Sequence, residues 1–276
     1  MRTDADRLLL GPHASQDPPI KSGRRQFLAG LVAAMVAATR ETGAHTNRVS
    51  RQAPRAILFD GFPLLDPRPV GVLAQELDPQ NGAALMQAWR TRQFEYQWLR
   101  ALGERYVDFR QVTEDSLVFA ARQTGVSLTS EKRARLMNAY TNLKLWPDVQ
   151  EVLPRIGRTG VKLGALSNMT DSMLESGLAV GNVRSLFSHV LSTDRIRSYK
   201  PARLAYQMGI DALGLGREQT LFVAFAGWDV AGATWFGYPT YWLNRLGSPP
   251  EELGAQPVGS GDDLKSLLDF LDPQLS

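Results

Sequence analysis

The stretch AILFDGFPLLD, residues 56–66, decides the fold of this chain. Its first four residues, Ala56 to Phe59, are apolar and typical of a buried strand, and Asp60 follows them directly. After the aspartate come a glycine, an aromatic residue, a proline and two leucines, whose side chains cannot hydrogen-bond to a carboxylate. A lone carboxylate at the end of a buried strand indicates a reactive group, or the remnant of one.

Short apolar runs alternate with helical patterns along the later part of the chain. The runs that predict strands are 161–168, 189–193, 220–226 and 239–244. The patterns that predict helices between them lie near 170–180, 201–213 and 229–236. Strands separated by helices of this length indicate an α/β fold, with a Rossmann-like parallel sheet covered by helices on both faces.

The part of the chain between the first and second predicted strands contains no strand-like run. It predicts helices within 82–106, 113–126 and 129–143. Thr113 and Thr129 are the expected N-caps of the second and third of these helices. An all-helical block at this place is best explained as an inserted cap. We therefore predict a core made of residues 55–70 and 147–276, and a helical cap made of residues 71–146.

The N-terminal region has the layout of an export signal. In SGRRQFLAGLVAAMVAAT, residues 22–39, Arg24 and Arg25 precede an apolar run of about a dozen residues, and small residues follow. The order S-x-R-R-x-F-L resembles the twin-arginine signal of bacteria. A membrane-spanning helix would need a longer run, of about 18–20 apolar residues. The other interpretation is a short amphipathic or buried helix after a polar tail.

The export signal sets expectations for processing and location. Cleavage is expected after Ala38 or Ala44, so residues 1–54 are predicted to be a twin-arginine-type signal peptide and spacer. The expected partner is the twin-arginine export machinery, and the expected location is the bacterial periplasm. The chain has no cysteine, which excludes disulfides and thiolate metal sites.

The net charge of +3 comes from the N-terminal region of this chain of 276 residues. Residues 1–54 hold eight of the 31 Lys and Arg and four of the 28 Asp and Glu, which leaves 23 basic and 24 acidic residues elsewhere. The remainder therefore shows no basic footprint, and no nucleic-acid partner is expected. Two of the three histidines precede residue 46, so a His-rich metal site is not expected either.

Four polar landmarks follow the ends of successive predicted strands. They are Asp60, the pair Ser167–Asn168, Lys200 and Asp229. Ligands of such sheets bind beyond the carboxyl ends of the strands, so these side chains are expected to form one charged pocket. Each residue alone could instead be a cap, a turn residue or a solvated charge. Their common place at four strand ends favours the pocket.

At this point the sequence resembles the haloacid dehalogenase superfamily, and within it the type II 2-haloacid dehalogenases. The likeness covers almost all of residues 55–247. LFD with a following aromatic, LSNM, YKPARLAY and LFVAFAGWDVAGATWFGYPTYWLNR resemble the core motifs in order and spacing. These motifs are shared with phosphatases, whereas WRTRQFEYQWLRALGERYVDF, residues 89–109, closely resembles the cap segment peculiar to the dehalogenases.

The resemblance implies a two-step reaction on Asp60. This carboxylate would attack C2 of a short (S)-2-haloalkanoate, expel halide and form an ester with inversion. Water would then hydrolyse the ester at the aspartyl carbonyl and release an (R)-2-hydroxy acid. A covalent route divides a difficult displacement into two easier steps. The resemblance implies no metal and no other cofactor, a small 2-haloacid as the substrate, and a homodimer as a common assembly.

The resemblance also assigns the other site residues. Arg90 would receive the halide, Lys200 would hold Asp60 ionised, and Asp229 would help to activate the hydrolytic water. Ser167 and Asn168 would orient the substrate carboxylate or the nucleophile. The residues expected to form the apolar wall are Phe62, Phe109, Tyr206 and Trp228.

Several residues beside the predicted site depart from the family pattern. Pro63 and Leu64 replace Gly-Thr, so an N–H donor and a hydroxyl are lost. Ala224 and Ala226 stand where Ser and Asn are usual, and Met169 replaces a Gly. One lost catalytic donor can cost about 2.7–4 kcal/mol of transition-state stabilisation. The losses lie at least as much around the water-activating carboxylate, so we expect alkylation of the nucleophile to be better preserved than ester hydrolysis.

Two other functions follow from these departures. A phosphatase of the same superfamily would need acidic metal ligands, but Phe62 and Phe225 occupy those two positions. A binding protein that kept the scaffold and lost turnover would explain the lost donors. Halide release from a 2-haloacid distinguishes the enzyme from the binding protein.

Overall fold

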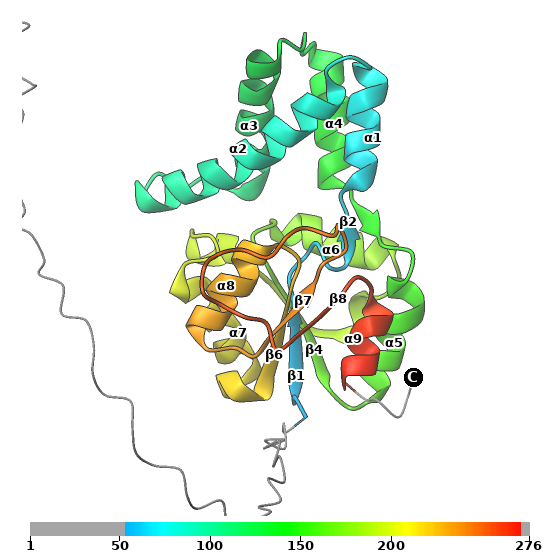
Figure 1. Ribbon diagram of the computed structural model, residues 1–276, viewed down its shortest axis with the longest axis vertical. Helices are drawn as coiled ribbons and strands as arrows, with labels where there is room; N and C mark the ends of the chain where they lie inside the picture. The colour runs from blue at the N-terminus through cyan, green and yellow to red at the C-terminus, as the bar shows by residue number, and fades with distance from the viewer. Residues whose placement is uncertain (1–52, 272–276) are drawn as a thin grey trace, which may run out of the picture. The chain divides into compact units, whose positions relative to one another are not determined.

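The computed structural model describes residues 53–271. Its core is a parallel sheet with the strand order β5-β4-β1-β6-β7-β8 (Figure 1). The strands are β1 (Ala56–Phe59), β4 (Lys162–Ser167), β5 (Phe187–Ser192), β6 (Thr220–Ala224), β7 (Thr240–Leu243) and β8 (Gly259–Gly261). All neighbouring strands in this sheet pair in parallel, which confirms the predicted Rossmann-like α/β class.

Helices cover both faces of the sheet because β1 alternates its apolar side chains. Ile57 and Phe59 belong to the hydrophobic cluster on one face, and Leu58 belongs to the cluster on the other. The first face is covered by α5 (Val149–Arg158), α6 (Asp171–Val180) and α9 (Leu264–Leu271). The second is covered by α7 (Arg203–Leu213) and α8 (Gly227–Phe236). The short 3₁₀ helices are η1 (Arg184–Leu186), η2 (Thr193–Ile196) and η3 (Arg217–Gln219).

Four helices lie between β2 (Leu65–Asp66) and β3 (Lys144–Leu145) and form the cap in Figure 1. They are α1 (Arg68–Leu77), α2 (Gly82–Leu102), α3 (Phe109–Thr124) and α4 (Ser130–Thr141). The chain enters and leaves them through a two-stranded antiparallel ribbon of β2 and β3. Helix α1 begins three residues before the predicted boundary at residue 71.

The N-cap predictions for the cap helices had different outcomes. Thr129 caps α4, since its side chain accepts a hydrogen bond from the backbone N–H of Lys132. The prediction for Thr113 was wrong: Asp108 caps α3, and Thr113 is buried one turn further into the helix. The carboxylate of Asp108 accepts from the N–H of Gln111, which satisfies a donor of the first turn.

The predicted signal peptide and spacer fall almost entirely outside the described residues, which begin at residue 53. Between residues 53 and 271, no helix is long and apolar enough to cross a membrane.

Candidate active site

Asp60 after β1, Ser167 at the end of β4 and Lys200 after η2 lie together. Asp60 continues the ladder, since its N–H donates to the carbonyl of Val223, and its side chain lies beyond the sheet. Oδ1 of Asp60 accepts from Nζ of Lys200 at 2.8 Å and from Oγ of Ser167 at 3.0 Å. Oδ2 accepts from the N–H of Phe62 at 3.2 Å. The carboxylate is therefore held mainly through one oxygen.

Asp229 completes the charged cluster from the first turn of α8. Its Oδ2 accepts from Nζ of Lys200 at 2.5 Å, and its Oδ1 accepts from the hydroxyl of Tyr206 at 2.7 Å. Its side chain does not cap its own helix. One buried ammonium thus bridges two carboxylates, those of Asp60 and Asp229.

Burial and mutual charge set the protonation states of this cluster. Burial, and to a smaller extent the charge of Asp60, raise the pKa of Asp229 to about 6, although Lys200 opposes the shift. Burial alone would lower the pKa of Lys200, but Asp229 and Asp60 together outweigh it and raise that pKa. Burial and the neighbouring Asp229 also hold the pKa of Tyr206 well above its usual range. Lys200 therefore stays an ammonium and Tyr206 a hydrogen-bond donor.

The turn after Asp60 is held through its carbonyl oxygens. The N–H groups of Leu64 and Leu65 both donate to the carbonyl of Gly61, which closes the turn without a donor from Pro63. Proline is therefore tolerated at its place in the turn, although it removes an N–H. The carbonyls of Phe62 and Pro63 accept hydrogen bonds from side chains far away in the chain. These bonds hold the turn in place of the N–H and the hydroxyl that the family pattern has there.

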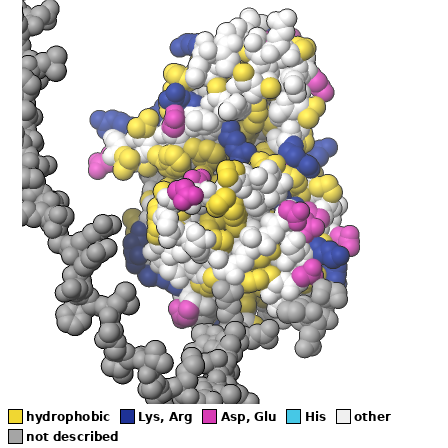
Figure 2. Space-filling view, in the orientation of Figure 1, with side chains coloured by type: hydrophobic (Ala, Val, Ile, Leu, Met, Phe, Trp, Pro, Cys, Tyr) yellow, Lys and Arg dark blue, Asp and Glu magenta, His cyan; other side chains and the backbone are white. Residues whose placement is uncertain are grey.

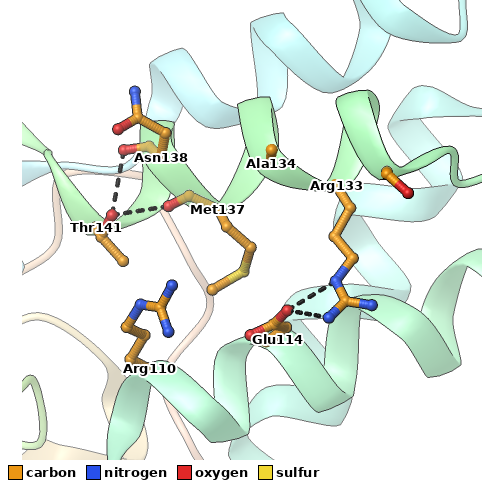
Figure 3. A pocket seen from close by; sticks show the side chains of 8 residues that line it. Arg110, Glu114, Arg133, Ala134, Met137, Asn138 and Thr141 are labelled. Carbon is orange, nitrogen blue, oxygen red and sulfur yellow. Dashed lines mark hydrogen bonds and ion pairs between the residues drawn. The ribbon is translucent and has the colours of Figure 1, made fainter.

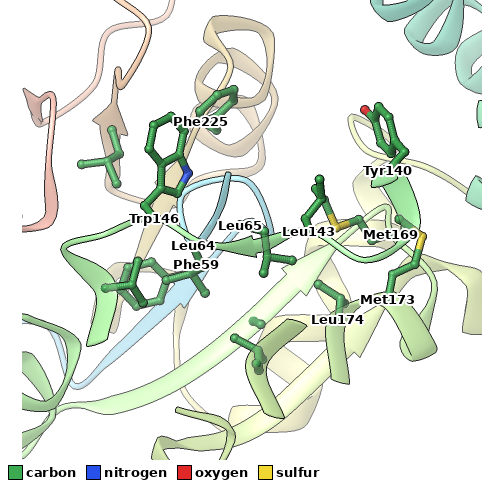
Figure 4. Packing of buried hydrophobic residues seen from close by; sticks show 14 of the residues in the cluster. Phe59, Leu64, Leu65, Tyr140, Leu143, Trp146, Met169, Met173, Leu174 and Phe225 are labelled. Atoms are coloured by element: carbon green, nitrogen blue, oxygen red, sulfur yellow. The ribbon is translucent and has the colours of Figure 1, made fainter. Parts of the chain in front are cut away.

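Trp146 and Arg245 supply that support. Nε1 of Trp146 donates to the carbonyl of Phe62 at 2.9 Å, and Nε of Arg245 donates to the carbonyl of Pro63 at 2.9 Å. The guanidinium of Arg245 also stacks on the Trp146 ring at 4.7 Å. Figure 4 shows the Trp146 ring beside Leu64 in the hydrophobic packing under the turn.

Gly61 leaves room for the side chain of Met169. A Cβ on Gly61 would lie 2.9 Å from Oγ of Ser167 and 3.1 Å from Sδ of Met169, so a side chain there would collide with both. Met169 is completely buried, and its Sδ lies beside Gly61. The methionine that replaces the usual glycine is therefore accommodated by the glycine that follows the nucleophile.

Arg90 lies on cap helix α2 with its guanidinium 5.5 Å from the centre of the Phe225 ring. Within residues 53–271 no carboxylate and no hydrogen-bond acceptor pairs with this guanidinium. It borders a small cavity of about 20 Å³. The lining residues are Phe62, Pro67, Met86, Arg90, Phe94, Tyr140 and Phe225. An unpaired cation beside an apolar cavity is suited to receive a small anion.

Phe225 fills part of the space at the predicted site. Its ring lies 5.6 Å from that of Phe62 and 6.4 Å from that of Trp146. These aromatic contacts bury Phe225 between the nucleophile turn and Arg90. The resemblance places metal-binding acids at the positions of Phe62 and Phe225, so the residues present do not fit a magnesium-dependent phosphatase. In the described part of the chain, no three His, Cys, Asp or Glu side chains gather to hold a metal.

Among residues 53–271, Asn168 makes no hydrogen bond to Asp60, unlike Ser167 beside it. Its Oδ1 accepts from the N–H of Lys200 at 2.8 Å and from Oγ1 of Thr193 at 3.2 Å. Its Nδ2 donates to Oε1 of Gln97 at 2.8 Å and to the carbonyl of Lys200 at 3.4 Å. The expected role in orienting the nucleophile directly is therefore not seen in this arrangement.

The predicted apolar wall is distributed over three places. Phe62 lines the small cavity, and Phe109 packs inside the cap, 6.3 Å from the Tyr140 ring. Trp228 contacts Phe94 of the cap at 5.4 Å between ring centres. Tyr206 acts as a hydrogen-bond donor to Asp229 rather than as an apolar wall. Sequence reasoning assigned no role to Trp146, Arg245, Gln97 or Tyr140, because their contacts join segments far apart in the chain.

Another cavity lies on the cap, away from the charged cluster (Figure 3). It has a volume of about 500 Å³. Figure 3 shows Arg110 and an ion pair of Arg133 with Glu114 along its walls. None of the predicted site residues lines it. Its size therefore does not connect it with the chemistry of Asp60.

Comparisons with known proteins agree with this geometry. A family model described as haloacid dehalogenase-like hydrolase matches residues 99–242. The (S)-2-haloacid dehalogenase of Pseudomonas sp. (strain YL) is 36% identical over 219 residues, which are 79% of this chain and 94% of that protein. The (S)-2-haloacid dehalogenase 4A of Burkholderia cepacia is 36% identical over 198 residues, which are 71% of this chain and 86% of that protein.

Solved structures give the same result. A crystal structure of an L-2-haloacid dehalogenase is 40% identical with a TM-score of 0.77, over 80% of this chain and 99% of that one. The L-2-haloacid dehalogenase of Xanthobacter autotrophicus with chloropropionic acid covalently bound is 28% identical with a TM-score of 0.71, over 81% of this chain and 100% of that one. The chain belongs to the haloacid dehalogenase-like hydrolases, in the group of the (S)-2-haloacid dehalogenases.

Proposed function

We propose that this protein hydrolyses short (S)-2-haloalkanoic acids to (R)-2-hydroxy acids through an ester on Asp60. The observation that carries the proposal is the asymmetric binding of the Asp60 carboxylate. Lys200 and Ser167 both donate to Oδ1, whereas Oδ2 accepts, among the residues that the structure describes, only from the N–H of Phe62. Oδ2 is therefore the less stabilised oxygen and the better nucleophile, while Oδ1 keeps the group ionised and oriented.

In the first step Oδ2 of Asp60 attacks C2 of the substrate, and the carbon–halogen bond breaks with inversion. The halide leaves with the bonding electrons. Arg90 provides a cation on the cap, at a cavity that Phe62 also lines. Phe62 also donates its N–H to Oδ2 of Asp60, so the nucleophile and Arg90 approach the same cavity. An unpaired guanidinium beside apolar rings stabilises a departing anion more than bulk water would.

In the second step water attacks the carbonyl carbon of the Asp60 ester. Asp229 is the group that takes the proton of this water, because its raised pKa of about 6 makes it a better base than an ordinary carboxylate. The bond between that carbon and the ester oxygen breaks, the leaving alkoxide takes the proton from Asp229, and the 2-hydroxy acid leaves with the oxygen that Asp60 supplied. The Asp60 carboxyl group then loses its proton to solvent. Lys200 contacts both carboxylates and offsets the negative charge that develops.

The cavity supports a short substrate. It measures about 20 Å³ and is enclosed by aromatic rings from the cap and the core, those of Phe94, Tyr140, Phe62 and Phe225. A long alkyl chain would require several of these rings to move. We therefore infer a preference for two- and three-carbon haloacids.

Halide release tests the proposal directly. The wild type and Asp60→Asn are incubated with (S)-2-chloropropionate, and chloride and lactate are measured together. Release of both in equal amounts by the wild type alone supports the proposal. Equal chloride from the two proteins, or none from either, contradicts it.

A second candidate is a ligand-binding protein that no longer turns over. The observation in its favour is the loss of polar groups near Asp229: Ala224 is completely buried, and Phe225 packs against Phe62. Such a protein would bind a 2-haloacid, or its hydroxy acid, and release no halide. Calorimetric titration with (S)-lactate and (R)-lactate beside the chloride assay separates the two functions.

We also propose that the protein is exported. The support is the arrangement of Arg24 and Arg25 before an apolar run. Cell fractionation of the full chain tests this, with Arg24→Lys together with Arg25→Lys as the control. Export predicts a shortened wild-type protein in the periplasm and a full-length variant in the cytoplasm. The homodimer implied by the resemblance is tested by light scattering of the purified protein.

A further inference from the structure

Gln97 is a completely buried polar residue in the C-terminal half of cap helix α2. Its Oε1 accepts from Nδ2 of Asn168 at 2.8 Å, and its Nε2 donates to the carbonyl of Gln93, one turn earlier in the same helix. Gln97 therefore joins the cap to the core through a buried hydrogen bond. A buried amide that loses such a partner costs about 1–3 kcal/mol.

Asn168 uses all of its side-chain hydrogen-bonding capacity in this arrangement. The two donors of the amide go to Gln97 and to the carbonyl of Lys200, and the oxygen accepts from the N–H of Lys200 and from Thr193. Its orientation is therefore fixed by one cap residue and two core segments. A change at the cap contact leaves one of these four bonds unmade.

The loops that Asn168 connects carry the two donors to the nucleophile. Ser167 precedes Asn168 directly, and both backbone polar groups of Lys200 bond to the Asn168 side chain. Ser167 and Lys200 both donate to Oδ1 of Asp60. The position of Asn168 is thereby coupled to the two side chains that orient the attacking carboxylate.

Gln97 also shares a helix with the proposed halide-binding residue. Arg90 and Gln97 are seven residues apart in α2, which is about two turns, so they lie on the same side of the helix. A rigid helix held at Gln97 places Arg90 at a fixed distance from the core. Figure 2 shows hydrophobic side chains along α2 and on the adjacent part of the core. Beyond the end of α2, two further hydrogen bonds join cap and core, from Tyr106 to Asp194 and from Tyr199 to the carbonyl of Val107.

We propose that Gln97 is a positioning residue, which aligns the cap guanidinium and the nucleophile's donors through Asn168. The proposal rests on the proposed function, because the alignment matters for the displacement on Asp60. It predicts a loss of rate rather than of substrate affinity. A misplacement of about 1 Å can slow a reaction roughly 100-fold.

Gln93 provides a matched control in the same helix. It is as deeply buried as Gln97, and it bonds to Thr113 and Tyr140. All of its partners belong to the cap, so Gln93→Met removes buried hydrogen bonds without touching the core. If Gln97 had only a structural role, Gln97→Met and Gln93→Met would have similar effects.

The first test measures the rate of Asp60 ester formation by quenched-flow intact mass at saturating (S)-2-chloropropionate. Gln97→Met is expected to slow it about 10- to 100-fold at unchanged half-saturation, and Gln93→Met less than about threefold. Gln97→Glu keeps the acceptor for Asn168. Because burial keeps the new carboxyl neutral at lower pH, its rate relative to the wild type is expected to rise between about pH 8 and pH 6. Equal ester rates in the two Met variants overturn the proposal, as does a Gln97→Glu ratio that does not depend on pH.

The second test needs no activity. The chain has no cysteine, so spin labels attach only at cysteines introduced at exposed Leu102 of the cap and Leu204 of the core. The distribution of distances between the labels is expected to broaden in Gln97→Met and not in Gln93→Met. If the wild type forms no ester, the proposed function fails, and the distance distributions alone then test the positioning role of Gln97. Equal distributions in the two variants then overturn the positioning role.

Discussion

Nζ of Lys200 lies 2.8 Å from Oδ1 of Asp60, although the two residues are 140 positions apart in the chain. The parallel sheet makes this contact, because it gathers the ends of its strands at one edge. Both side chains are buried, so the ammonium and the carboxylate interact with little screening by water. The same ammonium contacts Asp229, and the cluster carries one positive charge beside two carboxyl groups.

Replacing Lys200 by Met is expected to slow ester formation about 100- to 1,000-fold, since Asp60 loses the donor that orients it. Two carboxyl groups would also remain buried without their counter-ion. The unfolding free energy at neutral pH is therefore expected to fall by about 3–5 kcal/mol. Quenched-flow mass measurements and urea unfolding check the two effects. Lys265→Met, at an exposed position of α9, is the matched control. An ester rate within threefold of the control would argue against the role of Lys200.

Ester hydrolysis is expected to decline once the pH falls below about 6, the pKa of Asp229 in the free protein, because protonated Asp229 cannot accept a proton from water. In the ester Asp60 is neutral and no longer raises this pKa, so the decline begins at a lower pH than 6. The ester on Asp60 should therefore accumulate at pH 5. The folded-state pKa of Asp229 is raised above its unfolded value, so this group stabilises the folded protein as the pH falls from about 6 to 4. Unfolding through Asp229 is thus not the cause of the decline, and circular dichroism at each pH checks this. Hydrolysis that stays constant from pH 8 to 5 would exclude Asp229 as the base.

Restoring the lost polar groups is expected to speed the second step more than the first. Ala226→Asn and Ala224→Ser place an amide or a hydroxyl near Asp229, where the family usually has them. One such group is worth about tenfold or more in the rate of ester hydrolysis. Single-turnover decay of the isolated ester measures it. Ala226→Leu controls for size alone, and an equal acceleration by Leu would show that hydrogen bonding is not the cause.

Trp146→Phe is expected to loosen the turn after Asp60. The change keeps an aromatic ring but removes the donor to the carbonyl of Phe62. The unfolding free energy should fall by about 1 kcal/mol, and ester formation should slow several-fold. Trp235→Phe, at an exposed position of α8, is the control for the substitution itself. If both variants form the ester at the wild-type rate, the indole does not support the nucleophile.

The main layout of the fold could be predicted from periodicity. The strands ending at Asp60 and Ser167 are short apolar runs with no competing pattern, and the structure has them at those places. Helices α1, α5 and α9 were not predicted. Pro154 lies inside α5 and weakens its local signal, although its buried face packs on the sheet. These three helices depend on packing against the rest of the fold more than on a local sequence pattern.

The candidate site could be predicted only in part. Residues that follow strand ends were identifiable because topology alone brings them together, as with Lys200 and Asp60. The contacts of Gln97 with Asn168 and of Arg245 with Pro63 depend on side-chain geometry across the cap and the sheet. Neither pair has a pattern in the sequence. Tyr206 was expected in the apolar wall because its hydroxyl partner, Asp229, is visible only in three dimensions.

The central claim is that turnover passes through an ester on Asp60. A single turnover of excess protein with (S)-2-chloropropionate in ¹⁸O-water tests it most directly, followed by mass measurement of the Asp60 peptide and of lactate. The account predicts one ¹⁸O atom in Asp60 and none in the lactate, because water attacks the aspartyl carbonyl. Label in the lactate with an unlabelled Asp60 would mean that water displaces the halide directly, and would contradict the account.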